Sequence, residues 1–365
     1  MMKQSVLLAL LLGLLSACQP SVEDILKEND YAKSFDYVWN TLDANYPYFD
    51  YVTVDMDKKS ESYENYIRRT EKITDTHEFR KLLHDFTEEF NDPNIILNYP
   101  SQGISCLNLI TSRDYCASNL CATDKYIGGQ YEEEWNNGEC AIEGPFLFKW
   151  VYRETTNGSR NIYPLIVCFP SGKIRPDSIA DNILQKLTYY SSLIQYYPST
   201  KGIVLDLRCC YRFDSDFIQK LAPYMFEKGK HELYPSPSSS NVPNTIEGNG
   251  LLVNIPIAVI VNEGTIGESS WLARILQPRE NIVIVGRANA GPGCIRVTSE
   301  EKNGISVTYP SARIEKDGTT FYDPLVPEIL VDWAGGDATA LGVQGEYSDN
   351  LDYCLSAALD FIDSY

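Results

Sequence analysis

The clearest signal for the fold is one stretch of sequence, Ile257-Ala-Val-Ile-Val-Asn-Glu-Gly-Thr-Ile-Gly-Glu-Ser-Ser-Trp271. Its five consecutive apolar residues, Ile257 to Val261, are typical of a strand that is buried on both faces of a sheet. A glycine-bearing turn follows, and the spacing of apolar residues over Glu268–Leu276 predicts a helix. A buried strand that leads through a turn into a helix is the repeating unit of an α/β sheet.

Other short apolar runs flank this unit, and helical patterns lie between them. The runs Tyr163–Phe169, Gly202–Leu207 and Ile282–Val285 predict further buried strands, and Asp177–Tyr197 and Asp214–Phe226 predict helices. Strands that alternate with helices indicate an α/β sheet covered on both faces. We therefore expect residues 162–365 to form an α/β core.

The chain of 365 residues is long enough for two or three domains, and its first half has a different pattern. Over residues 34–100, apolar residues recur at helical spacing, as in Phe35, Val38, Trp39 and Leu42, which predicts an N-terminal helical domain. Residues 101–161 are rich in Cys, Gly and Asn and have no strong period. They predict a Cys-rich insert or a small β subdomain.

The first residues have the pattern of an export signal. Lys3 precedes the apolar run Val6–Leu15, and Leu-Ser-Ala then leads to Cys18. This order resembles the bacterial lipoprotein signal, which implies cleavage after residue 17, a lipid on Cys18 and a tether over residues 18–33. An ordinary signal peptide with an incidental cysteine is the alternative. The resemblance predicts a lipid-anchored protein of the bacterial cell envelope, and Gln19 favours the outer membrane.

Export places the remaining cysteines where disulfides persist. Cys106, Cys116, Cys121 and Cys140 crowd one loop-like segment, and no Cys-x-x-Cys pair or nearby histidine supports a zinc site. We expect disulfides among these four, with the connectivity open. We expect no metal and no cofactor.

Charge excludes one class of partner. With 31 Lys and Arg against 50 Asp and Glu, the formal net charge is −19, which repels nucleic acids. The same charge repels anionic membrane surfaces, so the only predicted membrane contact is the lipid anchor. The 3 histidines leave little material for imidazole bases or metal sites.

Two strand ends carry the candidate chemistry, because side chains at the carboxyl ends of parallel strands meet at one edge of a sheet. One strand ends in Asp206-Leu-Arg208, and the other leads into Thr265-Ile-Gly-Glu-Ser-Ser270. Backbone N–H groups at a helix start can hold an oxyanion, and a serine there is placed as a nucleophile. A serine or glutamate at a helix start is more often simply a cap.

These junctions resemble motifs of the C-terminal-processing (tail-specific) serine peptidases and their tricorn-like relatives, particularly the lipoprotein members of Bacteroidetes. The resemblance runs through most of the chain: Phe35–Phe49 to the opening helix, Phe90–Leu97 to the Asp-Gly-His segment, Gly202–Arg208 to the Asp-x-Arg strand, Val261–Leu276 to the nucleophile turn and helix, Val285–Gly293 to the next turn, and Pro324–Ile329 and Asp349–Leu359 to the closing segments. It implies a crotonase/Clp-protease-like ββα core, a helical N-terminal domain and a peptide-binding cleft. Residues Asp206, Arg208, Thr265, Glu268 and Trp271 would line that cleft.

The catalytic positions of the family are not kept. Gly267 stands at the nucleophilic serine and Ser270 at the glutamate of Thr-x-Ser-x-x-Glu. Pro292 stands at the lysine base of one branch, and Asn94 at the histidine of the other. Cys210-Tyr211 replaces the Gly-Gly pair. The resemblance therefore implies a member that has lost peptidase chemistry and keeps a cleft for a peptide or another ligand.

Two active alternatives stay open, together with an inactive one. Ser269 or Ser270 could serve as the nucleophile of an active serine hydrolase, although they lie two and three helical steps of about 100° from the family position. Cys209 or Cys210 could pair with His231 as a thiol and imidazole. A purely structural envelope protein, with the cleft filled by side chains, is the third hypothesis.

Overall fold

A computed structural model describes most of the chain. Its backbone is described for residues 20–99, 104–107, 140–143, 146–168, 176–208, 210, 219–234, 244–262, 264–277, 279–286, 292–331 and 353–365, and the side chains of 104–107, 140–149, 167–184 and 353 lie outside the description. The chain divides into two compact units. Unit 1 comprises residues 1–91, 95–108 and 298–308, and unit 2 comprises 92–94, 109–297 and 309–365.

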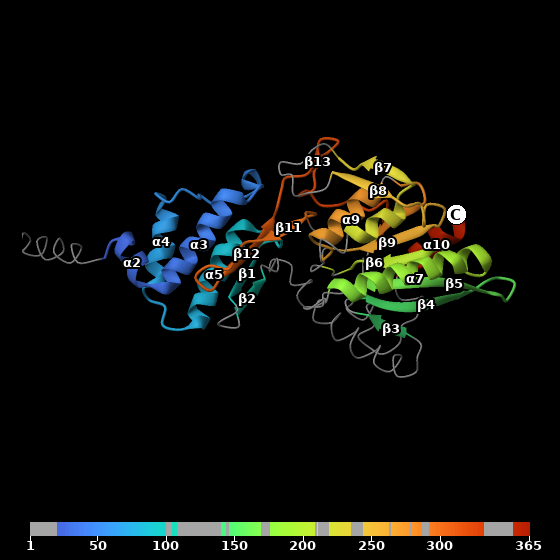
Figure 1. Cartoon of the computed structure of the whole chain (residues 1–365), viewed down its shortest axis with the longest axis horizontal. Coiled ribbons are helices and arrows are strands. Elements are labelled where there is room, and N and C mark those ends of the chain that lie inside the picture. Colours follow the sequence, from blue (N-terminus) through green and yellow to red (C-terminus); the bar gives the residue numbers. More distant parts are fainter. Residues whose placement is uncertain are drawn as a thin grey trace, which may run out of the picture. The chain divides into compact units, whose positions relative to one another are not determined.

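Unit 1 begins with helices (Figure 1), and the described ones are α2 (Val22–Glu28), α3 (Asp30–Asn45), the 3-10 helix η1 (Phe49–Tyr51), α4 (Glu61–Thr70) and α5 (Thr76–Phe90). Each α-helix of this set begins at a side chain that accepts a backbone N–H: Ser21, Asn29, Ser60 and Asp75. Such caps satisfy donors that have no partner within the helix.

The predicted helical spacing produces an aromatic core in unit 1. Phe35 stacks on Tyr66 with ring centroids 5.1 Å apart, and Trp39 stacks on Phe86 at 5.3 Å. Aromatic pairs at these distances add stabilisation beyond the burial of their area.

The sequence predicts a tether over residues 18–33, but α2 and the start of α3 lie within this range. Ser21 and Asp24 form a capping box that starts α2.

Unit 1 also contains most of a four-stranded sheet with the order β11-β12-β1-β2. Its strands are β1 (Ile96–Tyr99), β2 (Ile104–Leu107), β11 (Arg296–Thr298) and β12 (Ser306–Pro310). The unit thus continues past residue 100, the predicted end of the helical domain, and the hairpin of residues 298–308 returns to it. Within the unit, Ser34 Oγ donates to Asn303 O over 2.8 Å, which ties the hairpin to α3.

Unit 2 contains a seven-stranded sheet in the order β15-β10-β9-β6-β5-β4-β3. The strands are β3 (Cys140–Glu143), β4 (Phe146–Glu154), β5 (Arg160–Cys168), β6 (Ile203–Asp206), β9 (Ile257–Val261), β10 (Ile282–Gly286) and β15 (Ile329–Leu330). Strands β5, β6, β9, β10 and β15 are parallel, while β4 and β3 are added antiparallel.

The composition of this sheet differs from the prediction for residues 140–161. The sequence places residues 140–161 in a separate Cys-rich insert or small β subdomain, whereas they form β3, β4 and the first residues of β5 in the main sheet. The weak sequence period of this part gives no sign of its pairing with β5. In residues 101–139 only β2 is described, and it belongs to unit 1.

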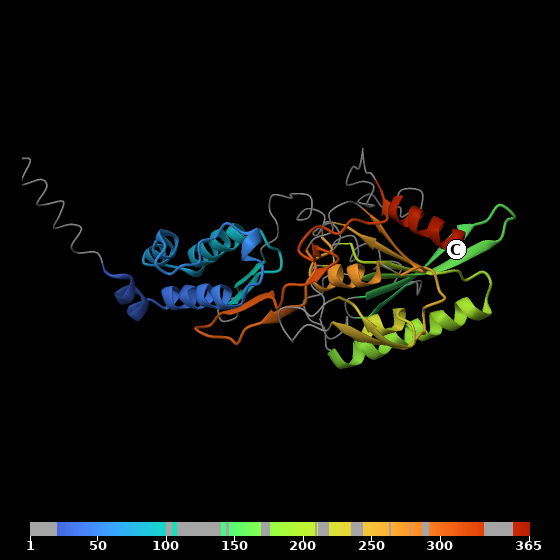
Figure 2. The same cartoon turned by 90° about the horizontal axis from the view of Figure 1, so that it is seen from above.

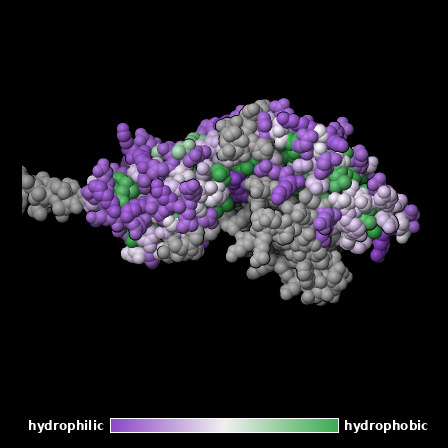
Figure 3. Space-filling view, viewed as in Figure 1, coloured by the Kyte–Doolittle hydropathy of each residue, from purple (hydrophilic) through white to green (hydrophobic). Residues whose placement is uncertain are grey.

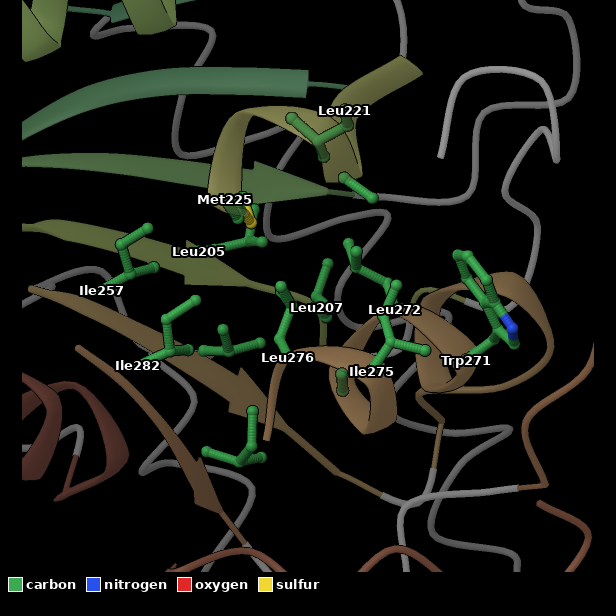
Figure 4. Close-up of a cluster of buried hydrophobic side chains, with 14 of the residues drawn as sticks. Leu205, Leu207, Leu221, Met225, Ile257, Trp271, Leu272, Ile275, Leu276 and Ile282 are labelled. Carbon is green, nitrogen blue, oxygen red and sulfur yellow. The ribbon is translucent and has the colours of Figure 1, made fainter. Parts of the chain in front are cut away.

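Helices cover both faces of the seven-stranded sheet, and α10 (Tyr353–Ser364) and α7 (Pro176–Tyr196) lie on opposite faces (Figure 2). Alternate strand residues enter two separate cores. Leu205, Val259 and Ile284 pack in the core that includes α7 and α9 (Glu268–Leu276), and Val204 and Ile260 pack against α10. Figure 4 shows the first core, with side chains from β6, β9, β10 and α9 meeting. The predicted mixed α/β architecture is confirmed.

One predicted helix is shorter than expected. The sequence predicts a helix over residues 214–226, and in the described part, from residue 219 onward, the α-helical backbone stops at Leu221 and the 3-10 helix η3 (Ala222–Met225) follows. Pro223 has no N–H to continue an α-helix. Two short hairpins complete the unit: β7 (Gly229–Glu232) with β8 (Thr245–Gly248), and β13 (Glu315–Lys316) with β14 (Thr319–Thr320).

The export signal and the predicted disulfides fall on residues about which the structure says little. Cys18, Cys116 and Cys121 lie outside the described residues, and Cys106 and Cys140 are described by their backbone alone. In the described part of the chain, no helix combines the length and apolar character needed to cross a membrane. Cys210, Cys294 and Cys354 are buried thiols.

Candidate functional site

Strand β6 ends in a buried ion pair. The Asp206 carboxylate accepts from Arg208 Nε at 3.0 and 3.1 Å and from Arg208 Nη2 at 2.6 Å, and it also accepts the Arg208 backbone N–H at 3.0 Å. The fork of donors on Arg208 matches the two carboxylate oxygens. This pair fixes the backbone just after the strand.

The turn after β9 is bonded to the end of β6. Thr265 Oγ1 donates to Leu207 O over 2.8 Å and accepts from Asn262 N over 3.0 Å. Ile266 N donates to Cys210 O over 3.3 Å. The two junctions that the sequence singles out are therefore neighbours, because β6 and β9 pair in parallel and end at the same edge of the sheet.

Gly267 caps α9 and has a backbone conformation, φ +65° and ψ −128°, that suits glycine alone. Its N–H donates to Pro292 O over 2.9 Å, and its carbonyl accepts from Cys294 N over 3.2 Å. A Cβ at this position would lie 3.0 Å from Nε and Cζ of Arg296. The position that the sequence resemblance assigns to the nucleophile thus has no side chain, and the Arg296 guanidinium occupies the adjoining space.

The Arg296 guanidinium pairs with Glu268. Arg296 Nε donates to Glu268 Oε2 and Arg296 N donates to Glu268 Oε1, each over 2.9 Å, and the two side chains are only 6% and 3% exposed. Burial alone would lower the pKa of this guanidinium, but the Glu268 carboxylate outweighs it and the pKa is raised. The Arg296 guanidinium therefore keeps its charge although it is buried.

Ser269 and Ser270, the alternative nucleophiles, are fully buried in α9. Ser269 Oγ donates to Cys210 O and, over 2.9 Å, to Ile266 O. Its hydroxyl therefore links the helix start to the β6 junction. Ser270 lies one residue further along the buried helix and also has an interaction partner.

Asn94 and Pro292, which the sequence resemblance assigns to the positions of the family's bases, lie beside Gly267. Asn94 Nδ2 donates to Asp92 Oδ1 over 2.9 Å and weakly to Pro292 O at 3.4 Å. Asn94 Oδ1 is buried and accepts no hydrogen bond from the described part of the chain. An amide and a proline carry no basic atom near neutral pH, so neither provides a general base. Tyr211, the remaining replaced position, lies outside the described residues.

The thiol and imidazole alternative has little geometric support. His231 lies on β7, where its Nε2 is 2.8 Å from Glu227 O and its ring packs against Phe226 at 5.5 Å. Cys210 is fully buried, and Cys209 lies outside the described residues. His231 therefore has its described contacts with the η3–β7 region.

The residues predicted to line a cleft lie mainly below the surface. Asp206, Thr265, Glu268 and Trp271 are buried, and the Arg208 side chain is 11% exposed. Trp271 points into the core shown in Figure 4 and donates from Nε1 to Tyr234 OH over 3.1 Å. Trp271 is thus a core residue.

Sequence reasoning missed Arg296, and it gave Cys294 no role beyond that of a small buried residue, which it is. Burial raises the pKa of the Cys294 thiol well above its usual range, and the Glu268 carboxylate adds to that effect. The single charge of Arg296 within an apolar stretch was the available signal, but its partner lies 28 residues away. Among the described residues, no group of three or more His, Cys, Asp or Glu could hold a metal ion.

Comparison with known proteins bears on the fold of the chain. The family model of the tricorn protease C1 domain matches residues 27–88, which comprise α3, α4 and most of α5. A proposed peptidase from Parabacteroides merdae has a similar structure, with a TM-score of 0.58 and 16% identity, over 91% of this chain and 98% of that one. In fold, the chain resembles the tail-specific and tricorn-like serine peptidases.

Other solved structures add to this resemblance. Mature CPAF, solved in complex with lactacystin, matches with a TM-score of 0.52 and 12% identity over 93% of this chain and 100% of that one. The photosystem II D1 C-terminal processing protease matches with a TM-score of 0.44 and 13% identity over 83% and 93%, too weakly to add an argument. No curated protein sequence is significantly similar. At these identities the likeness establishes the fold alone.

Proposed function

We propose that this chain is a lipid-anchored protein of the bacterial cell envelope that has a tail-specific-peptidase fold and binds an extended peptide segment without hydrolysing it. In this proposal, unit 2 has a crotonase/Clp-protease-like ββα core and the helices of unit 1 correspond to the family's N-terminal domain. The resemblance in fold to peptidases supports peptide as the ligand class, and an extended peptide can bind by adding to a sheet edge as a strand.

One observation is the main support for the proposed lack of hydrolysis. The Arg296 guanidinium lies next to Gly267, in the space where a nucleophilic side chain would project. Nucleophilic catalysis needs a hydroxyl or thiol beside a base, together with donors for the oxyanion. Gly267 offers no side-chain atom, and its N–H is engaged by Pro292 O. The neighbouring Asn94 offers no base.

A fluorophosphonate probe and an unstructured reporter peptide test this part. The purified chain is expected to show neither covalent labelling nor cleavage. Labelling that Ser269→Ala or Ser270→Ala abolishes, and that the exposed-site control Ser192→Ala leaves intact, would make the chain an active serine hydrolase. The controls separate specific labelling from reaction at surface hydroxyls.

Fluorescence anisotropy with labelled unstructured peptides tests the retained binding. We expect saturable binding, with unlabelled peptide as a competitor. If no peptide of a varied set binds at concentrations up to about 1 mM, a threshold for free energies near −4 kcal/mol, the chain is better described as a structural envelope protein.

Fractionation tests the lipid anchor. Expressed with its leader in a bacterial host, the chain is expected in the membrane fraction, and Cys18→Ala is expected to release it, because the acyl chains supply the attachment. Retention of Cys18→Ala in the membrane would contradict the proposed anchor. Cys354→Ala, which changes a buried thiol far along the chain, is the matched control.

A further inference from the structure

Four tyrosines stand exposed at one end of unit 2, and we call them the tyrosine face. Tyr189 and Tyr196 belong to α7, Tyr197 follows that helix directly, and Tyr152 lies on β4. Their exposed fractions lie between 53% and 72%. A single exposed aromatic side chain is common, but a group of them on neighbouring elements is typical of an interaction surface.

Backbone pairing brings Tyr152 to the end of α7. Tyr152 is opposite Ile162 in the β4–β5 ladder, and Ile162 N donates to Ser199 O over 2.7 Å, just beyond Tyr197. Two residues before Tyr152, and so on the same face of the strand, Trp150 packs against Tyr190 of α7 at 5.1 Å. Figures 1 and 2 show the β4–β5 hairpin and the end of α7 at the same end of the sheet.

The segment of the tyrosine face that comprises the end of α7 and Tyr197 has no charged residue. Between Lys186 and Lys201 the sequence has no charged residue, although charged residues make up 22% of the chain and its net charge is −19. The intervening polar residues are Ser, Thr and Gln. In Figure 3 the surface at the right-hand end, where α7 ends, is largely pale. Such a surface complements a ligand that is itself uncharged and rich in hydrogen-bonding groups.

We propose that the tyrosine face binds a neutral oligosaccharide chain. The apolar C–H face of a hexose ring packs on an aromatic ring, while its hydroxyls bond to the phenol and to neighbouring Ser, Thr and Gln side chains. Tyr189 and Tyr196 are seven residues apart, so they lie on the same side of the helix about 10.5 Å from each other along its axis. That spacing is close to the length of one disaccharide unit, so every second sugar of an extended chain meets a tyrosine ring.

A peptide fits this surface less well. The backbone groups in the interior of α7 are bonded within the helix, so they offer no partners for strand addition. The aliphatic residues Leu193 and Ile194 pack against the core cluster and are not available as anchors. The tyrosine face and the Gly267 region have no residue in common, so this proposal does not depend on the one for the Gly267 region.

Affinity electrophoresis of the purified chain tests the proposal. The gels contain hydroxyethyl cellulose, galactomannan or dextran as neutral polymers and polygalacturonate as an anionic one. We expect at least one neutral polymer to retard the chain, and polygalacturonate to leave its mobility unchanged. The variant Tyr189→Ala/Tyr196→Ala/Tyr197→Ala is expected to bind that polymer about tenfold more weakly. The corresponding triple Phe variant is expected to keep most of the affinity, because the rings remain.

Tyr365→Ala, which removes a tyrosine of similar exposure on the far side of the sheet, serves as the matched control. Circular dichroism of each variant confirms that it is folded, which the exposure of these side chains favours. The proposal is overturned if none of the three neutral polymers retards the chain, or if the triple Ala variant is retarded equally. It is also overturned if sedimentation shows a dimer that the triple Ala variant lacks, because the face would then bind a second copy.

Discussion

The two junctions of the α/β core both end in a buried ion pair, but the pairs differ in how far apart their partners lie in the chain. Asp206 and Arg208 are two residues apart at the end of one strand. Glu268 and Arg296 are 28 residues apart, and both belong to unit 2. A local pair requires almost no loop closure, whereas the distant pair forms only once the fold has brought its partners together. The distant pair is also the one that lies against Gly267.

Removal of the distant pair's cation should have the largest effect. Arg296→Met leaves the Glu268 carboxylate buried and without its guanidinium, which is expected to reduce the free energy of unfolding by about 3–5 kcal/mol. Urea denaturation followed by circular dichroism measures the change. The double variant Glu268→Gln/Arg296→Met removes both charges and is expected to recover part of the loss. A loss below about 1 kcal/mol in Arg296→Met would show that the pair is not truly desolvated.

Gly267→Ala tests the space beside that pair. The substitution places a Cβ against the Arg296 guanidinium in a backbone conformation that other residues avoid, so we expect a loss of about 2–3 kcal/mol in unfolding free energy. Gly158→Ala is the matched control, since Gly158 has φ +78° and a Cβ there would meet nothing within 4 Å. The control isolates the conformational cost, about 1 kcal/mol. If Gly267→Ala and Gly158→Ala reduce the unfolding free energy equally, the Arg296 side chain moves aside at no measurable cost.

The local pair should prove less sensitive. Asp206→Asn keeps the shape of the side chain and removes its charge, and the Arg208 side chain can turn toward solvent because it is 11% exposed. We expect a loss of about 2 kcal/mol, the range for hydrogen bonds to charged groups. The same urea titration measures it. A loss larger than that of Arg296→Met would reverse the ranking of the two junctions.

The smallest expected effect is a pH dependence near the distant pair. Burial raises the pKa of the Cys294 thiol in the folded state, so the folded protein holds this proton at a pH where the unfolded chain releases it. The resulting stability is present below the unfolded value, about 8.5, and declines as pH rises above it, by at most about 1.4 kcal/mol per unit. Cys294→Ala should show a shallower decline between about pH 8 and 10. Identical slopes would contradict this prediction.

The positions of strands and helices could be predicted from the short-range pattern of apolar residues. The run Ile257–Val261 and the helix Glu268–Leu276 have in the structure the bounds that the apolar period predicts. The pattern is readable because a residue's burial on a strand or helix depends on its position in a fixed period. The partnership of β4 with β5 was not readable, since pairing depends on which segments meet in space.

The candidate site shows the same division. The sequence by itself determined that Gly267, Asn94 and Pro292 carry no nucleophile or base, because that depends only on which atoms each side chain has. Only the tertiary structure decided what occupies the space beside Gly267. Arg296 reaches it from a strand 28 residues beyond Glu268, and no local pattern encodes which buried carboxylate a distant guanidinium will neutralise.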